Sequence, residues 1–250
     1  MVQGQDDACL IFTSGSTGEA KGVRISHAAL VSRSGVERRA YEFTSADVHL
    51  FRTSPAFVGL PVALTILASG VTLAVASDDV GDQAEGLVGL MTALGVTFAP
   101  LAPRLIERLL DQPNLKARLP ALRVVRSAGE SLPPEVASRF AAALPFTRLV
   151  DGYGTTETSG VIASADVTGP MASRADASGS VALPGVTLQV VGPDGQPASE
   201  GEVWVATPML ATGYLGGELG DEPRFIDSVL VGGGPPMRWY RTGDRGRLTS

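Results

Sequence analysis

The chain has 250 residues, 44% of them hydrophobic and 18% charged, which is typical of a globular protein with one large domain or two small ones. Its net charge of −6 argues against a nucleic-acid partner, and its single cysteine excludes an internal disulfide and, without a Cys/His cluster, a zinc site. No run of about 18 apolar residues indicates a membrane span and the N-terminus is no signal peptide, so we expect a cytoplasmic protein without a membrane partner.

The first two thirds of the chain alternate short apolar runs with helix signals. Apolar runs that stop at turn residues predict strands at 8–12, 71–76, 96–99 and 122–127. Helix signals, with Ser26 as an N-cap and prolines that open the last helix, predict helices at 26–39, 61–67, 82–94, 103–110 and 133–144. This alternation indicates an α/β fold, with a mostly parallel sheet and flanking helices.

The pattern changes near Ser164, where Gly, Pro and Asp begin to punctuate short apolar runs. Strands predicted at 187–191 and 202–206 flank a Pro-Asp-Gly turn, which is typical of a hairpin. We therefore expect two subdomains, an α/β unit at 1–163 and a smaller β-rich unit at 164–250.

Residues 13–22 read Thr-Ser-Gly-Ser-Thr-Gly-Glu-Ala-Lys-Gly. Glycines let the backbone approach a polyanion, hydroxyl and N–H groups donate hydrogen bonds, and Lys21 supplies positive charge. A plain flexible Ser/Gly loop fits this composition too. A Walker loop does not fit, because Gly22 stands where Ser or Thr would hold magnesium.

Two later motifs add a ring and two carboxylates. In Asp-Gly-Tyr-Gly-Thr-Thr-Glu at 151–157, Tyr153 could stack on a base, the threonines could donate to phosphate, and Glu157 could bind Mg²⁺. A tight turn with a surface Tyr explains this motif equally simply. In Tyr-Arg-Thr-Gly-Asp at 240–244, Asp244 could accept both hydroxyls of a ribose, although Asp next to Gly is common in turns.

In this order the motifs resemble the adenylate-forming superfamily, which holds acyl-CoA synthetases, luciferases and the adenylation domains of nonribosomal peptide synthetases. Two further stretches match, Ser-Ala-Gly-Glu-Ser-Leu-Pro at 127–133 and Gly-Glu-Val-Trp-Val at 201–205, the latter leading to Gly-Tyr at 213–214. Each motif alone is weak, but five in the family's order cover nearly the whole chain.

The resemblance implies a role for each matching position. The loop that holds the ATP pyrophosphate would comprise Thr13, Ser14, Gly15, Ser16, Thr17, Gly18 and Lys21. The adenine pocket would be lined by Ala128, Gly129 and Glu130, with Tyr153 stacked on the base. Thr156 would contact the α-phosphate, Glu157 would bind magnesium, and Asp244 would bind the ribose hydroxyls. Among these, Lys21, Thr156 and Glu157 would form the catalytic group.

The implied cofactors are ATP and Mg²⁺, and the implied substrate is a small carboxylic acid. Its carboxylate would attack the α-phosphorus of ATP, and the acyl group would then pass to the thiol of coenzyme A or of a carrier-protein phosphopantetheine. Positioning and charge neutralisation would carry most of this chemistry.

The chain departs from the family in its extent. Family members have a stretch ahead of the phosphate loop and continue past Asp244 into a C-terminal subdomain, whose lysine contacts the substrate carboxylate. Neither Lys21 nor Lys116 matches that lysine. We therefore expect an incomplete core that binds nucleotide weakly and adenylates poorly or not at all. The alternative is a non-catalytic nucleotide-binding fragment, or a scaffold that another chain completes.

A second departure concerns the acid. Amino-acid-activating members carry an Asp that pairs with the substrate α-ammonium, and Val58 takes that position here. An ammonium buried against valine would have no charge partner, so we expect an acid without a free α-amine, such as a keto, hydroxy, aryl or fatty acid. The neighbours in its pocket would be Val62, Arg126, Gly160 and Val161.

Arg126, His27 and His49 lie outside the matching motifs. Arg126 follows apolar Val124 and Val125, and strand alternation favours an outward-facing side chain. The alternative is that Arg126 pairs with a second carboxylate of the substrate. His27 and His49 receive no role, because an isolated histidine is more often structural than catalytic.

Overall fold

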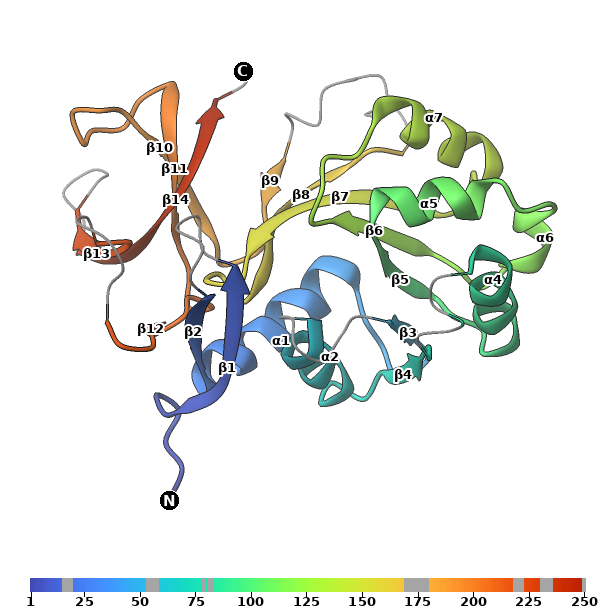
Figure 1. Cartoon of the computed structure of the whole chain (residues 1–250), viewed down its shortest axis with the longest axis horizontal. Helices are drawn as coiled ribbons and strands as arrows, with labels where there is room; N and C mark the ends of the chain where they lie inside the picture. The colour runs from blue at the N-terminus through green and yellow to red at the C-terminus, as the bar shows by residue number, and fades with distance from the viewer. Residues whose placement is uncertain are drawn as a thin grey trace.

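The computed structural model describes residues 1–14, 20–52, 59–77, 80, 83–168, 180–217, 223–229 and 236–248. In these residues the strands form a seven-stranded sheet, a four-stranded sheet and a three-stranded sheet (Figure 1). The expected fold class is confirmed, since a mostly parallel sheet with helices on both faces is followed by an antiparallel β-rich part.

The seven-stranded sheet has the order β4-β3-β5-β6-β7-β8-β9. Its strands are β3 (Val48–Phe51), β4 (Thr72–Val75), β5 (Phe98–Leu101), β6 (Val124–Ala128), β7 (Arg148–Thr155), β8 (Gly160–Asp166) and β9 (Val181–Ala182). Neighbours from β4 to β7 run parallel, whereas β8 and β9 pair antiparallel. The parallel part therefore needs a helix after almost every strand, as the alternating sequence predicts.

Helices cover both faces of this sheet (Figure 1). One face carries α4 (Ala84–Ala93), α5 (Pro103–Leu110), α6 (Leu115–Arg118) and α7 (Pro134–Ala143), and the other carries α1 (His27–Tyr41) and α2 (Gly59–Leu67). Successive residues of β6 divide between the two cores: Val125 packs with the α4–α7 side, and Val124 packs with Tyr41 and Ile66 on the α1–α2 side. Both faces are therefore buried.

This arrangement shows that the favoured outward orientation of Arg126 is wrong. Arg126 shares a face of β6 with Val124, as alternation predicts, but α1 covers that face and leaves the residue only 7% exposed. Its Nη1 donates to both carboxylate oxygens of Glu37 in α1, at 2.7 and 3.0 Å. Strand alternation separates two faces, but it does not tell which of them meets solvent.

The expected cap of α1 is confirmed. Ser26 has extended backbone angles, and its Oγ accepts a hydrogen bond from the N–H of Ala29 at 3.2 Å. The bond satisfies one of the free N–H groups of the first turn. It fixes where α1 begins, directly after β2.

The remaining strands form two antiparallel sheets. The four-stranded sheet has the order β10-β11-β14-β13, with β10 (Thr187–Val191), β11 (Glu200–Ala206), β13 (Phe225–Ser228) and β14 (Met237–Arg247). The three-stranded sheet joins β1 (Asp7–Ser14), β2 (Ala20–Ser26) and β12 (Gly213–Tyr214). A division after residue 163 would cut β8, and the four-stranded sheet begins only with β10, so the two-subdomain boundary stays a prediction.

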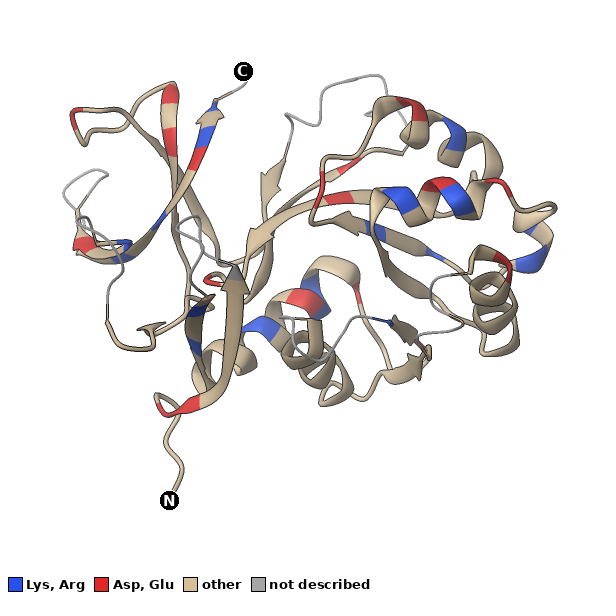
Figure 2. Cartoon of the chain, in the orientation of Figure 1, with Lys and Arg blue, Asp and Glu red and all other residues tan. Residues whose placement is uncertain are grey.

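Residues of both charge signs occur along α5 and α7 (Figure 2). Among the helices in the described ranges, none combines the length and apolar character that crossing a membrane requires.

Candidate functional site: two adjoining cavities

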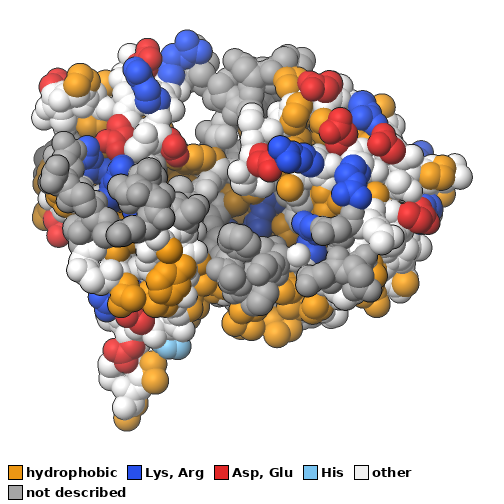
Figure 3. Space-filling view, viewed as in Figure 1, with side chains coloured by type: hydrophobic (Ala, Val, Ile, Leu, Met, Phe, Trp, Pro, Cys, Tyr) orange, Lys and Arg blue, Asp and Glu red, His pale blue; other side chains and the backbone are white. Residues whose placement is uncertain are grey.

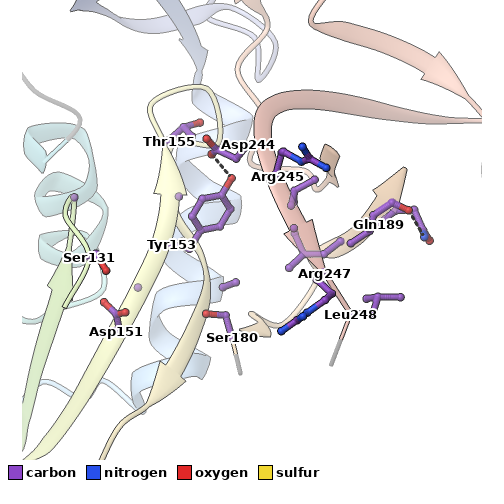
Figure 4. A pocket seen from close by; sticks show the side chains of 18 of the residues that line it. Ser131, Asp151, Tyr153, Thr155, Ser180, Gln189, Asp244, Arg245, Arg247 and Leu248 are labelled. Carbon is purple, nitrogen blue, oxygen red and sulfur yellow. Dashed lines mark hydrogen bonds between the residues drawn. The ribbon is translucent and has the colours of Figure 1, made fainter. Parts of the chain in front are cut away.

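The first cavity, which we call the Tyr153 cavity, has a volume of about 670 Å³. It lies between β7 and the strands β10 and β14, where the surface is hollowed on the face shown in Figure 3. Four residues predicted to bind adenine or ribose lie on its wall: Gly129, Glu130, Tyr153 and Asp244. The Oη of Tyr153 donates a hydrogen bond to Oδ2 of Asp244 at 2.6 Å (Figure 4).

A bulge in β14 aims Asp244 at this cavity. Three residues of β14 (242–244) stand opposite Val203 alone, which interrupts the ladder with β11. Thr242 Oγ1 donates to the carbonyl of Val203 at 2.7 Å, and Gly243 adopts a φ of 80°. Bulges of this kind redirect side chains. The Gly in the sequence motif is thus explained by the backbone that presents the carboxylate.

The motif ends β7 with Gly154 and Thr155 and then enters the tight turn at 156–159, which leads to β8. A Cβ on Gly154 would lie 2.1 Å from the carbonyl oxygen of Gly160, so only glycine fits there. Thr158 Oγ1 closes the turn by accepting from the N–H of Thr155 at 2.9 Å. The turn interpretation of this motif is therefore compatible with the nucleotide interpretation, because the turn holds Tyr153 in place beside the cavity.

Burial, followed by the hydrogen bond to Asp244, raises the pKa of Tyr153 above its ordinary value. The phenol therefore stays protonated at neutral pH and can donate to the carboxylate. A donated hydrogen bond leaves the other oxygen of Asp244 available to a further donor, such as a sugar hydroxyl.

The second cavity, which we call the Arg126 cavity, has a volume of about 410 Å³ and lies where β6 and the β7–β8 turn meet α1 and α2. Four residues predicted to contact the acid lie on its wall: Val62, Arg126, Gly160 and Val161. Val58, the fifth, lies outside the described residues. The wall also contains Ala128 and Thr156.

The two cavities adjoin, because Gly129, Gly154 and Thr155 line both of them. The predicted ribose contact and the predicted adenine contacts Glu130 and Tyr153 thus lie on one side of these three residues, and the described acid contacts lie on the other. Ala128, predicted to line the adenine pocket, lines only the Arg126 cavity. Thr156, predicted to contact the α-phosphate, directly follows the shared Thr155. A nucleotide and an acid bound in the two cavities would meet at this junction.

The floor of the Arg126 cavity holds a buried ionic cluster. Glu37 accepts hydrogen bonds from Arg126 and from Arg33, its i−4 neighbour in α1, and Arg33 also donates to the carbonyl of Val161. Burial alone would raise the pKa of Glu37, but the charges of Arg126 and Arg33 outweigh it and lower the pKa to about 2. Glu37 is therefore ionised over the whole physiological range.

His49 lies on the same wall, and its ring stacks on Phe98 with a centroid distance of 4.9 Å. Burial, followed by the positive charge of Arg126, lowers the pKa of His49 to about 4. The imidazole is therefore neutral at pH 7. Its position next to Arg126 makes protonation costly, and this gives stability a pH dependence.

We expect the free energy of unfolding to fall by roughly 3 kcal/mol between pH 6.5 and pH 4 because of His49 alone. The folded-state pKa of His49 lies below the ordinary histidine value of 6.5, so the unfolded chain binds more protons in this window and acid favours unfolding. Urea titrations at pH 7.0 and pH 5.0, on the natural chain and on His49→Phe, measure how far the free energy of unfolding falls between these pH values. This fall should be much smaller in His49→Phe than in the natural chain.

The chain's other histidine provides the control. His27 is exposed, so His27→Gln should keep the full pH dependence. Glu37 and Asp47 also have lowered pKa values, each about 2, but the stability they contribute is lost only below the ordinary pKa values of these side chains, 4.5 and 3.8. An unchanged slope in His49→Phe between pH 7 and pH 5 would contradict the prediction.

Strands β1 and β2 hold the two ends of the predicted phosphate loop. Thr13 pairs with Lys21 across this antiparallel ribbon, and Ser14 pairs with Ala20. Gly15, Ser16, Thr17 and Gly18 lie outside the described residues. The structure thus places the loop between two paired strands, while its contacts with a nucleotide stay a prediction.

Glu157 is held on the side of this ribbon. Its Oε1 accepts a hydrogen bond from the Oη of Tyr214 at 2.9 Å, and its carbonyl accepts from the N–H of Ala211 at 2.7 Å. Tyr214 belongs to β12 and pairs with Val23 of β2, three residues after the loop's strand begins at Ala20. The predicted magnesium ligand is therefore tied to the strand that leaves the predicted phosphate loop, although Glu157 does not line either cavity.

Sequence reasoning missed two groups. The sequence shows Tyr214 only as part of the Gly-Tyr motif and does not predict its contact with Glu157, which lies 57 residues away along the chain. Arg33 and Glu37 have the i, i+4 spacing of an ordinary surface ion pair on a helix. The sequence carries no signal that this pair is buried, since burial depends on β6 bringing Arg126 beneath α1.

Residues 1–215 match the protein-family model described as AMP-binding enzyme. The chain belongs to this family. It is similar to indigoidine synthase of Streptomyces lavendulae, with 30% identity over 96% of this chain and 19% of the relative. It is also similar to peroxisomal OPC-8:0-CoA ligase 1 of Arabidopsis thaliana, with 30% identity over 97% of this chain and 44% of the relative. The chain thus spans less than half the length of these two relatives.

The fold of this chain is similar to that of a solved structure. The N-terminal subdomain of Klebsiella oxytoca NpsA, solved in complex with 3-hydroxybenzoyl-AMSN, superposes with a TM-score of 0.79 and 25% identity. The match covers 98% of this chain and 62% of that one. The relatives of this chain include both a CoA ligase and a hybrid PKS-NRPS synthetase.

Proposed function

We propose that this chain is the core of an ATP-dependent enzyme that joins a carboxylic acid to AMP and then passes the acyl group to a thiol of coenzyme A or a carrier protein. The observation that supports this most is the junction of the two cavities at Gly129, Gly154 and Thr155. Adenylation needs the acid's carboxylate beside the α-phosphate, and a shared boundary between a nucleotide cavity and an acid cavity provides that arrangement.

In this proposal Tyr153 presents its ring to adenine, and Asp244 accepts hydrogen bonds from the ribose hydroxyls. Ala128, Gly129 and Glu130 form the strip beneath the base, and Thr156 donates to the α-phosphate. Lys21 and the hydroxyls of the loop that begins at Thr13 neutralise and hold the pyrophosphate. These groups would position the reactants and stabilise negative charge that develops on phosphate oxygens.

The residues present fit a magnesium ion held mainly by ATP. Within the described part of the chain, no group of three His, Cys, Asp or Glu residues could hold a metal. Mg²⁺ commonly binds through one or two carboxylates together with substrate phosphates and water, so Glu157 alone suffices. The ion would supply neutralisation of phosphate charge, and Tyr214 would keep the Glu157 carboxylate in place.

Tyr214→Phe tests this arrangement, because it removes the hydrogen bond to Glu157 and keeps the ring. We expect the Mg²⁺ concentration needed for half-maximal ATP binding to rise about tenfold, as is typical when a partner of a metal ligand is removed. Calorimetric ATP titrations over a series of Mg²⁺ concentrations measure it. ATP binding without Mg²⁺ is the control and should not change; an equal loss with and without the metal would mean that Tyr214 acts through the fold alone.

Two observations support an acid without a free α-amine. The first is Val58 at the position where a carboxylate would meet an ammonium. The second is the wall of the Arg126 cavity, whose described charged side chains are those of Arg33, Arg52 and Arg126, with no Asp or Glu on the wall itself. An ammonium group would be repelled there, whereas an uncharged or anionic substituent would be accepted.

ATP–pyrophosphate exchange with a panel of acids tests the activity and the acid class together. Keto, hydroxy, aryl or fatty acids should support exchange, and a preference for ordinary α-amino acids would refute the inferred class. AMP binding to the 250-residue chain, measured by calorimetry, separates nucleotide binding from catalysis. We expect this segment alone to bind AMP and to exchange slowly; an exchange rate equal to that of the longer relatives would overturn that expectation.

The second candidate function is a non-catalytic nucleotide-binding segment. It shares the prediction of AMP binding and differs only in turnover. Exchange in the presence of the rest of a longer chain, or of a separate chain that completes it, would decide for the enzyme. Absence of AMP binding would rule out both.

A further inference from the structure

The charges around the Arg126 cavity do not balance. Arg33 and Arg126 share Glu37, the carboxylate with which both form ion pairs, and the side chain of Glu37 is 1% exposed. None of the described wall residues is Asp or Glu, so no second carboxylate on the wall balances this pair of arginines. Buried positive charge in excess is costly unless an anion meets it. The cavity is therefore built to receive an anionic group.

The position of Arg126 shows where that group would lie. Arg126 and Ala128 point to the same face of β6, and a strand advances 3.3 Å per residue, so they are separated by about 7 Å along the strand. Ala128 lies at the junction with the Tyr153 cavity, next to the shared Gly129. Arg126 thus stands one short acyl chain away from the place where the reacting carboxylate would meet the nucleotide.

The guanidinium of Arg126 is held rigidly in this position. It lies over the rings of Phe98 and Tyr41, at 5.4 and 5.6 Å from the centroids, and Glu37 binds its Nη1. Its Nε is buried and has no hydrogen-bond partner among the described residues. A fixed guanidinium with an unsatisfied donor beside a cavity is suited to donate hydrogen bonds to a carboxylate of a ligand.

We propose that the Arg126 cavity selects an acid that bears a second carboxylate at the far end of a short acyl chain, with Arg126 as its partner. This proposal rests on the proposed function, because it takes the adjoining cavity as the nucleotide site. Arg126 then has the second of the two roles considered for it, as the partner of a second substrate carboxylate. The proposal narrows the substrate class from acids without an α-amine to dicarboxylic acids.

A purely structural role for the cluster predicts a different arrangement. A structural ion pair would match one carboxylate to one guanidinium and would be sealed from the cavity. Here one carboxylate serves two guanidiniums, and both arginines line the cavity, with Arg126 7% exposed and Arg33 0% exposed. Arg33 therefore neutralises and positions Glu37, and Arg126 is the member that can reach a ligand.

Binding of stable acyl-adenylate analogues tests the proposal without any need for turnover. The probes are adipoyl-, hexanoyl- and monomethyl-adipoyl-sulfamoyladenosine, which share chain length and nucleotide and differ only in the terminal group. Calorimetry on the unaltered chain should show the adipoyl compound binding about 10- to 100-fold more tightly than the other two, the range for a buried charged hydrogen bond. Equal affinities for all three would overturn the proposal.

Two variants separate recognition by Arg126 from a general effect of the fold. Arg126→Met leaves the Arg33–Glu37 pair intact and should abolish the preference, while hexanoyl affinity stays within about threefold of the unaltered chain. Arg126→Lys should restore part of the preference. A full preference in Arg126→Met would contradict the assignment, and if that variant does not fold, the three-ligand comparison on the unaltered chain still decides.

AMP provides the control that keeps the two proposals apart. If AMP itself does not bind, the proposed function fails, and with it the basis of this inference. If AMP binds and the terminal carboxylate gives no advantage, only the dicarboxylate assignment fails.

Discussion

Gly154→Ala should destabilise the chain by more than about 3 kcal/mol and remove nucleotide binding, because backbone must move to admit one methyl group. The added Cβ would lie 2.1 Å from the carbonyl oxygen of Gly160 and 2.7 Å from the Cα of Val161. Neither neighbour is a flexible side chain that could turn away. Relief would require the β7–β8 turn to open, and this turn lines both cavities.

Urea unfolding and AMP calorimetry on the same preparation measure the two effects of Gly154→Ala. Gly89→Ala is the matched control, since Gly89 is an exposed residue in the middle of α4 and an added Cβ meets no atom within 4 Å. In a helix that change should stabilise the chain by about 0.5 to 1 kcal/mol. A Gly154→Ala variant with natural stability would show that the turn is not as close as described.

Asp244→Ala should weaken AMP binding by about 100-fold while leaving stability nearly unchanged. The carboxylate is exposed enough to meet ligand, and its described interactions are local: it accepts from Tyr153, and its N–H donates to Thr242 Oγ1, a bond that the variant keeps. Loss of hydrogen bonds between a carboxylate and two ribose hydroxyls accounts for a change of this size. The prediction rests on the proposed ribose contact.

Calorimetry with AMP and with 2′,3′-dideoxy-AMP sharpens the test of Asp244. The natural chain should prefer AMP strongly, and Asp244→Ala should bind both compounds equally. Asp227→Ala is the matched control, because Asp227 is an exposed residue of β13 in the same sheet and does not line the cavity. Persistence of the AMP preference in Asp244→Ala would assign the ribose to another residue.

Local sequence patterns were sufficient for every described helix except α6 and for the strands β1, β4, β5, β6, β10 and β11, but they did not predict β7 and β14, which carry Tyr153 and Asp244. The prolines, the Ser26 cap and the apolar runs place these helices and strands within a few residues of where they occur, since each signal acts within one or two turns of chain. The Gly residues flanking Tyr153 and preceding Asp244 also pointed to special backbone, and the structure gives the reasons: a close approach at Gly154 and a bulge at Gly243.

Long-range pairing decided what the site residues contact. That Tyr153 meets Asp244 depends on β7 facing β14 across 91 residues, and that Glu157 meets Tyr214 depends on β12 joining β2. No local pattern encodes such distances, because the partners are brought together by sheets that form over the whole chain. The error at Arg126 has the same origin, since strand alternation is local and the burial of both sheet faces is not.

The sequence by itself determined the motifs, their order and hence the family, because these depend only on residue types and spacing. The tertiary structure alone decided that the two cavities adjoin and that one carboxylate is shared by two buried arginines. Charge balance in a cavity is a property of side chains drawn from α1, β3 and β6. It emerges only when those elements pack, and in our proposal it is the property that would select among acids.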